Sequence, residues 1–244
     1  MRYFITLSYD GTAYHGWQIQ PNAPSVQETL QRALATLLRQ DELEVTGAGR
    51  TDTGVHARLM VAHFDWGVVL DGPQLTYKLN KILPRDVAVK SIIPVSDDMH
   101  ARFSAVSRTY HYFLHLYKDP FLQGHSWQMY GPLDFEAMNR AAQVLLNYRD
   151  FTSFSKLHTD TKTNDCTVTE AHWDELAPGQ WRFTITANRF LRNMVRAIVG
   201  TLVEVGRGRL SPADVSRIIE LKDRCQAGES VPAHGLYLVD IKYP

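Results

Sequence analysis

One short window of this 244-residue chain, residues 47–57, gathers a carboxylate, two hydroxyls and a positive charge. Its three glycines allow the backbone to turn tightly and to approach a ligand closely. Asp52 lies between Thr51 and Thr53 and follows Arg50, so donors and a positive charge can keep its carboxylate ionised and oriented. This arrangement suits a nucleophile. Because Asp is also common among Gly and Thr residues in hairpin turns, a purely structural role in a turn is the alternative.

The residues around the window predict a loop that is held by strands. Residues 42–46 are predicted as a strand that enters the window, and residues 61–69 as a strand that leaves it. Asp52 is therefore expected on an excursion between two strands, where functional residues are often found. Further upstream, residues 2–9 alternate as a strand, and residues 10–18 form a glycine-rich turn that carries aromatic side chains.

The order of the predicted elements indicates the α+β class, with two similar units at residues 1–105 and 106–244. The other expected helices are at about 25–40, 73–82, 134–146 and 190–205, with one more after Ser211, and the other strands at 87–95, 108–116, 167–173, 180–187 and 235–241. Laid side by side, two such ferredoxin-like or RRM-like units would form one extended antiparallel sheet with a central cleft.

Composition limits the classes of function. The chain has 26 basic and 26 acidic residues, which argues against an indiscriminate nucleic-acid binder and requires any RNA site to be local. The two cysteines form no C-x-x-C pair, no stretch approaches membrane-spanning length, and a cytoplasmic protein is expected. The ten histidines show no metal-ligand spacing, and no dinucleotide, Walker or G-x-S-x-G motif is present.

Two later segments carry further candidates. In the strand at 108–116, Tyr110 and Tyr112 share one face, and the two-residue period alone places both in the core. In the helix at 190–205, Arg192 and Arg196 are four residues apart and are expected on one side. Arg196 lies beside the apolar stripe of that helix, so its charge should be partly buried and should need a carboxylate partner.

The pattern G-x-G-R-T-D-x-G-V-H-A of residues 47–57 resembles the signature of the tRNA pseudouridine synthase A family. Residues 107–112, 194–202 and 235–238 resemble that family's later motifs, in the same order along the chain. The resemblance implies the pseudouridine synthase fold and a homodimer. It implies that Asp52 is catalytic, that Arg196 pairs with it, and that the strand around Leu236 lines the pocket. It also implies that Tyr110 stacks on the target base, whereas Tyr112 is assigned to the core.

The implied reaction converts uridines 38, 39 and 40 of the tRNA anticodon stem-loop to pseudouridine. The bond from N1 to C1′ breaks, the uracil turns, and C5 is joined to C1′; no cofactor is implied. Asp52 attacks either C1′, much as in retaining glycosidases, or the uracil ring, and the sequence leaves both open. Arg50 and Arg58 are candidates for contacts with RNA phosphates or for moving the target nucleotide out of its stack.

Two other classes of function are alternatives. A non-catalytic RNA-binding module of RRM-like units would also combine α+β units with aromatic side chains on a sheet, but it has no need of Asp52 in a glycine-rich loop. A glycosidase or nucleoside hydrolase would need a second carboxylate as general acid, and none stands near the motifs.

Overall fold

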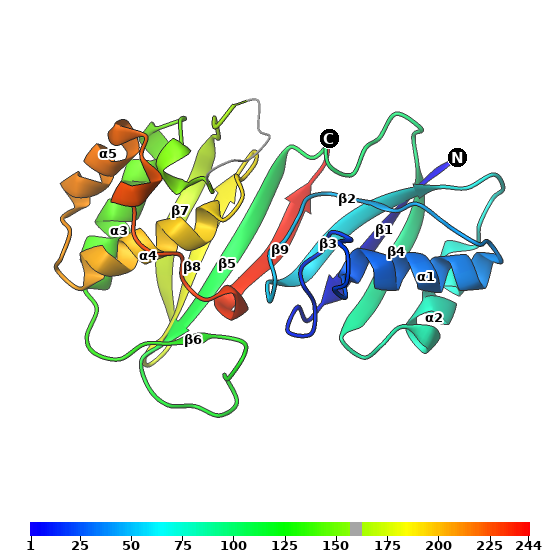
Figure 1. Cartoon of the computed structure of the whole chain (residues 1–244), viewed down its shortest axis with the longest axis horizontal. Helices are drawn as coiled ribbons and strands as arrows, with labels where there is room; N and C mark the ends of the chain where they lie inside the picture. The colour runs from blue at the N-terminus through cyan, green and yellow to red at the C-terminus, as the bar shows by residue number, and fades with distance from the viewer. Residues whose placement is uncertain (157–162) are drawn as a thin grey trace. The chain divides into compact units, whose positions relative to one another are not determined.

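The computed structural model describes residues 1–156 and 163–244. The chain packs into two compact units: residues 1–106 with residues 237–244 form unit 1, and residues 107–236 form unit 2. Each unit combines a sheet with packed helices, which can be followed by their labels in Figure 1. The prediction of an α+β fold is confirmed.

Unit 1 is built on a sheet in which β1 (Arg2–Tyr9) lies between β3 (His56–Asp65) and β4 (Val87–Val95) and is antiparallel to both. The short strand β2 (Thr46–Gly47) pairs with β3. On its other side β3 pairs in parallel with β9 (Leu236–Lys242), through His56 with Tyr237 and Ala57 with Leu238. From Tyr237 onward, the C-terminal strand therefore belongs to the same unit as the window around Asp52.

The helices of unit 1 begin where the sequence provides capping residues. In α1 (Val26–Leu38) the Ser25 hydroxyl accepts a hydrogen bond from the Glu28 amide, and in α2 (Gly72–Ile82) the Asp71 carboxylate accepts one from Gln74. The buried residues of α1 include Val26, Leu30 and Leu34, which recur at helical spacing. Both predicted helices are confirmed.

Unit 2 contains a sheet in which β8 (Gln180–Ala187) lies between β5 (Ser107–His115) and β7 (Val168–Ala177), antiparallel to both. A short strand, β6 (Trp127–Gln128), pairs in parallel with β5. Helix α3 (Phe135–Val144) packs against β7 and against two later helices, α4 (Met194–Gly206) and α5 (Pro212–Leu221), as Figure 1 shows. Single 3-10 turns are found at Leu145–Asn147, Thr152–Phe154, Arg224–Gln226 and Ala233–Gly235.

Among the described residues, the longest helices have 13 residues, and none combines the length and the apolar character needed to cross a bilayer.

The strands that flank the Asp52 window differ from their predicted bounds. Residues 42–45 form no strand, and β3 begins at His56 instead of residue 61 and ends at Asp65 instead of residue 69. The early start of β3 follows from its pairing, since Ala57 already lies opposite Tyr9 of β1. The loop between the two strands is therefore shorter than predicted and spans residues 48–55, because residues 47, 56 and 57 of the window belong to the sheet.

The start of α4 also corrects a prediction. Asn193 has a φ of 67°, in the left-handed region, so the helix begins at Met194 rather than at residue 190. The Asn193 side-chain amide donates to the Ser230 hydroxyl, which supports this conformation. Arg192 therefore precedes the helix and is exposed. The prediction that Arg192 and Arg196 lie on one side of the same helix is wrong.

Gly200 provides a test of how α4 packs. A Cβ atom at this position would lie 1.8 Å from the backbone oxygen of Glu229, so the segment at residues 228–231 can approach α4 only because Gly200 has no side chain. Gly200→Ala should reduce the free energy of unfolding by about 1–3 kcal/mol through overpacking, although Ala favours a helix by up to about 1 kcal/mol. Urea denaturation measures the difference. Gly67→Ala is the control, because a Cβ atom there would meet no atom within 4 Å; equal effects of the two substitutions would contradict the packing argument.

Candidate active site

Asp52 lies on the loop between β2 and β3, as predicted. The turn at residues 52–55 is closed by a hydrogen bond of 3.1 Å from the Val55 amide to the backbone carbonyl of Asp52. Gly54, the third residue of this turn, has a φ of 76°, the conformation for which turns of this kind select Gly. The hydrogen bond that closes the turn thus uses the backbone of Asp52 and not its carboxylate. The Asp52 residue is half-buried.

A second glycine-rich loop, residues 10–17, packs directly on the backbone of the Asp52 loop. A Cβ atom on Gly11 would lie 2.0 Å from the carbonyl oxygen of Val55, and one on Gly16 would lie 2.2 Å from that of Thr51. Gly16 also has a φ of 89°, which residues with a side chain rarely adopt. The two loops can therefore approach this closely only with glycine at both positions.

Hydrogen bonds complete the contact between the two loops. The Tyr9 and Thr51 hydroxyls are 2.8 Å apart and buried, and the Trp17 amide donates to the Thr51 carbonyl at 3.4 Å. The Gly54 amide donates to the Tyr14 carbonyl at 3.3 Å. Thr51, the residue directly before Asp52, is thus held both through its side chain and through its backbone. This fixes the main chain from which the Asp52 carboxylate projects.

Tyr14 in turn anchors the loop at residues 10–17 to the start of β4. Its hydroxyl donates to the Asp86 carboxylate at 2.8 Å. Burial, with the charge of Asp86, raises the pKa of Tyr14 to about 12, so the phenol keeps its proton and remains a donor at neutral pH.

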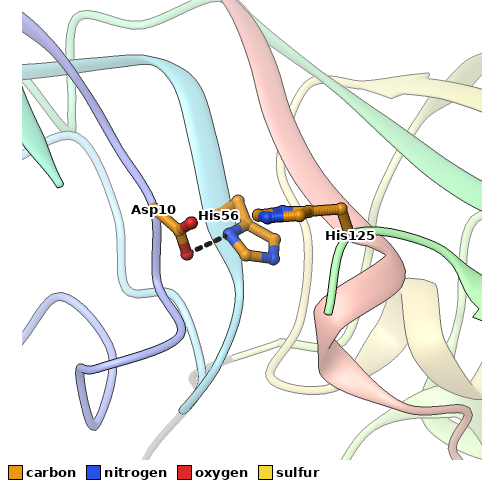
Figure 2. A group of neighbouring side chains, drawn as sticks. All are labelled: Asp10, His56 and His125. Carbon is orange, nitrogen blue, oxygen red and sulfur yellow. Dashed lines mark ion pairs between the residues drawn. The ribbon is translucent and has the colours of Figure 1, made fainter. Parts of the chain in front are cut away.

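His56, the first residue of β3, forms a buried cluster four residues after Asp52. Its Nδ1 atom lies 3.0 Å from the Gly11 amide nitrogen and 3.1 Å from a carboxylate oxygen of Asp10, and Figure 2 shows the Asp10 carboxylate beside the ring. A ring without a proton on Nδ1 accepts from Gly11, whereas a ring protonated there pairs with Asp10. The His56 ring also stacks on Tyr237 of β9, with centroids 4.5 Å apart.

Positive charge lies at the surface beside this cluster. The Arg58 guanidinium is 5.5 Å from the centre of the Tyr237 ring, and both Arg58 and Arg50 are exposed. Burial raises the pKa of Tyr237 to about 12, although the Arg58 charge opposes this shift. Both side chains are therefore accessible to an anionic ligand, and neither charge is buried in the protein.

In unit 2 the two tyrosines of β5 have different environments. Tyr112 is 0% exposed, and its hydroxyl donates to the Pro232 carbonyl at 2.9 Å, which confirms that it belongs to the core. Burial raises the pKa of Tyr112 well above its ordinary value. Tyr110 is half-buried, and its ring meets Phe190 edge-on with centroids 5.1 Å apart. The prediction from periodicity that both tyrosines lie in the core therefore holds for Tyr112 alone.

Arg196 is half-buried on the first turns of α4. Its Nε atom donates to the Val231 carbonyl at 2.7 Å, in the segment that packs against α4. Its positive charge opposes the rise in the pKa of Tyr112. Leu236 is 6% exposed. Gly235 precedes it, and a Cβ atom there would lie 2.8 Å from the Tyr112 ring.

The structure assigns the candidates to both units and adds residues that the sequence did not single out. Asp52, Arg50 and Arg58 belong to unit 1, whereas Tyr110, Arg196 and Leu236 belong to unit 2. The sequence showed the glycines and aromatic side chains of residues 10–18, but not what they contact. The sequence did not predict that Tyr9, Gly11, Gly16, Trp17 and His56 support the Asp52 loop.

The contact between the two loops predicts unequal effects of glycine substitutions. Gly16→Ala should reduce the free energy of unfolding by about 2–5 kcal/mol for two reasons. The backbone conformation at this position is strained for a residue with a side chain, and the new Cβ atom would clash with the Thr51 carbonyl. Gly49→Ala is the matched control, since a Cβ atom there would meet no atom within 4 Å and its φ is not in the left-handed region. Urea denaturation compares the two variants. A Gly16→Ala variant as stable as Gly49→Ala would show that the loops do not need this approach.

Comparison with known proteins identifies the family. The sequence model of the family described as tRNA pseudouridine synthase matches residues 5–104 and 141–244. Proteins named tRNA pseudouridine synthase A are similar to the whole chain. The one from Porphyromonas gingivalis is 58% identical over 246 residues, covering 100% of this chain and 97% of its own length. That from Bacteroides fragilis is 57% identical over 244 residues, covering 100% and 96%. The protein from Bacillus subtilis is 42% identical over 246 residues, covering 100% and 99%. With its glycine-rich Asp52 loop and these matches along its full length, the chain belongs to the tRNA pseudouridine synthase family.

Proposed function

We propose that this protein converts uridines 38, 39 and 40 of the tRNA anticodon stem-loop to pseudouridine, with Asp52 as the nucleophile. The general reaction follows from the family: the chain is an isomerase that acts on uridines in tRNA. This excludes the alternative of a non-catalytic RNA-binding module. The target positions and the role of each residue are the parts that we propose.

The observation that carries the assignment of Asp52 is the construction of its loop. Contacts from Tyr9, Gly16 and Trp17 fix the backbone of Thr51, and the turn after Asp52 is closed by main-chain atoms. A carboxylate on such a loop is oriented before the substrate binds, as nucleophilic catalysis requires. Cleavage of the N1–C1′ bond builds positive charge on the sugar, which a carboxylate can trap at C1′; addition to the uracil ring is the other route.

The reaction itself needs few groups. One bond from C1′ to N1 is replaced by one from C1′ to C5, the hydrogen of C5 leaves to solvent, and N1 gains a hydrogen. No electrons are transferred and no group is added, so we propose that the enzyme works without a cofactor. The carboxylate has to remain ionised throughout. We assign this task to Arg196, as the family motif implies.

The remaining candidates would bind the RNA. Tyr110 stacks on the extruded base, and Leu236 lines the pocket for it. Arg50 and Arg58 are exposed beside the Asp52 loop and its buried cluster, which supports contacts with phosphates around the target nucleotide. We further propose that the protein acts in the cytoplasm, where its tRNA substrate is, and that it is a homodimer.

Replacing Asp52 tests the nucleophile against a role in the turn. Asp52→Asn keeps the shape and an oxygen acceptor but removes the charge, so turnover should fall by about 10³-fold or more while tRNA still binds. The measurement is tritium release in a single turnover from tRNA labelled at C5 of uridine, because the new carbon bond expels that hydrogen.

Asp41→Asn is the control for the loss of one negative charge, because Asp41 is an exposed residue of the same unit. It should release tritium at the rate of the unsubstituted enzyme. Rapid release by Asp52→Asn, without deamidation back to Asp, would contradict its assignment as the nucleophile. Mapping pseudouridine in the product tests the target positions separately: modification only outside positions 38–40 would leave the reaction intact and refute that part of the proposal.

Substitution of Tyr110 separates the ring from its hydroxyl. Tyr110→Phe retains a face on which a base can stack and should keep most of the binding, whereas Tyr110→Ala should weaken it by about 1–3 kcal/mol and slow turnover further. Single-turnover rates at several tRNA concentrations measure both effects. Melting temperatures of the two variants come first, because Tyr110 contacts Phe190. Equal losses in two folded variants would assign the role to the hydroxyl and not to stacking.

A further inference from the structure

Residues 100–104 of unit 1 form a turn that presents an aromatic side chain for which the reaction has no assigned use. Phe103 is 75% exposed. The guanidinium of Arg102, also an exposed residue, lies over the Phe103 ring at 5.5 Å from its centre. An exposed aromatic ring next to a positive charge can bind an unpaired nucleotide, because the ring can stack on the base and the cation can contact a phosphate.

The turn that carries Phe103 is fixed by its own polar groups. The His100 Nδ1 atom accepts hydrogen bonds from the amides of Arg102, at 3.1 Å, and of Phe103, at 3.3 Å. The Ser104 hydroxyl accepts from the His100 amide, and the Ser104 amide donates to the His100 carbonyl, both at 2.9 Å. The His100 ring also lies 4.4 Å from the Phe103 ring. The backbone from which the Phe103 side chain projects is therefore held by the groups of the turn itself.

Buried groups anchor this turn to the sheet of unit 1. Ala101 is 0% exposed, its amide donates to His63 of β3 at 3.2 Å, and its carbonyl accepts from the Tyr243 hydroxyl at 2.6 Å. Arg2 of β1 donates to the Met99 carbonyl at 3.1 Å. Burial, with the charge of Arg2 next in effect, lowers the pKa of His63 to about 4, so its ring remains an acceptor at neutral pH.

The same strand separates this turn from the Asp52 loop. His63 lies near the end of β3, seven residues after His56, and Asp52 lies in the loop before His56. At about 3.3 Å per residue, the two contacts along β3 are separated by about 20 Å. The turn that carries Phe103 and the loop that carries Asp52 therefore lie near opposite ends of β3.

A second exposed aromatic side chain with a cation over it shows what distinguishes Phe103. Tyr77 of α2 is 64% exposed, and the Lys81 ammonium lies 5.2 Å from its ring centre. These two residues are neighbours simply because they are four apart on one helix. Arg102 and Phe103 are adjacent in the chain, so what distinguishes them is the turn at residues 100–104, whose backbone is held by Arg2 of β1, His63 of β3 and Tyr243 after β9. This difference gives a matched control.

We propose that Phe103 and Arg102 form a docking surface for an unpaired nucleotide of the tRNA, distinct from the nucleotide that is isomerised. Phe103 stacks on its base and Arg102 contacts a neighbouring phosphate. The chain has no net charge, so its affinity for RNA depends on local contacts of this kind. Stacking tolerates any base, so the surface adds affinity rather than sequence preference. The inference rests on the proposed function only in taking tRNA as the ligand.

Three substitutions of Phe103 test the stacking. Phe103→Ala should raise the Kd for tRNA about 5- to 150-fold, the range that stacking of one base spans. Phe103→Leu keeps an apolar side chain but has no flat face, and should lose nearly as much. Phe103→Trp should bind like the unsubstituted protein. The melting temperature should hardly change, because the side chain is exposed, and Tyr77→Ala should leave Kd unchanged.

The phosphate contact is tested by its dependence on salt. Arg102→Gln should reduce the slope of log Kd against log salt concentration by about 0.7–0.9, the value for one phosphate contact. Lys81→Gln is the control for removing a cation beside an exposed ring, and should leave the slope unchanged. An unaltered slope for Arg102→Gln would overturn this half of the proposal.

Transcripts with a single abasic nucleotide locate the contact. At one unpaired position outside 38–40, removal of the base should weaken binding by the unsubstituted protein but not by Phe103→Ala. Unchanged Kd for Phe103→Ala, or no position coupled to it, would overturn the proposal. An altered sedimentation coefficient of the Phe103→Ala protein without tRNA, together with an unchanged Kd for tRNA, would also overturn the proposal. That result would assign the surface to contact with a second copy of the chain. Failure of the proposed function is distinguishable, because unsubstituted enzyme would then release no tritium whatever the Kd values.

Discussion

The close approach of two main-chain segments is the constraint on which the Asp52 loop depends. Gly11 and Gly16 bring residues 10–17 against the carbonyl groups of Val55 and Thr51, at distances that no side chain permits. Main-chain atoms have no side-chain rotamers. This contact therefore costs none of the side-chain conformational entropy that a contact between two long side chains would cost. The position of Asp52 is therefore set chiefly by the backbone of its neighbours. The hydrogen bond that closes the turn uses the backbone of Asp52, so this bond does not depend on the carboxylate.

Charged and aromatic groups are arranged around that backbone contact in a consistent way. The Tyr9 hydroxyl, which contacts the Thr51 hydroxyl, is buried, whereas Arg50 and Arg58 are exposed. An isomerisation that exchanges one bond to C1′ for another needs orientation and a stable negative charge more than a set of acids and bases. A chain without net charge can meet both needs, provided that its positive groups lie where the RNA backbone passes.

Sequence patterns predicted the elements whose local signals agree with their packing. The bounds of β1, β4 and β8 were correct because their alternation ends at turn residues, and the motif located the Asp52 loop. The start of α4 was wrong because Leu191 is buried and continues the apolar period, while Asn193 leaves the helical conformation. Periodicity reports burial and not backbone angles. Contacts between the two glycine-rich loops were not predictable either, because residues about 40 positions apart meet only through the order of strands in the sheet.

That order of strands also connects the Asp52 loop with the surface that we propose around Phe103. The Asp52 loop precedes β3, and His63 near its other end holds the turn that carries Phe103. Because β3 is hydrogen-bonded to β1 along most of its length, it resists bending, and the spacing between the two contacts is constant. A nucleotide bound at a constant distance from the nucleophile restricts how the rest of the RNA can lie. Binding energy gained at Phe103 is then partly used to orient the target uridine, and such energy lowers the barrier to reaction as well as the Kd.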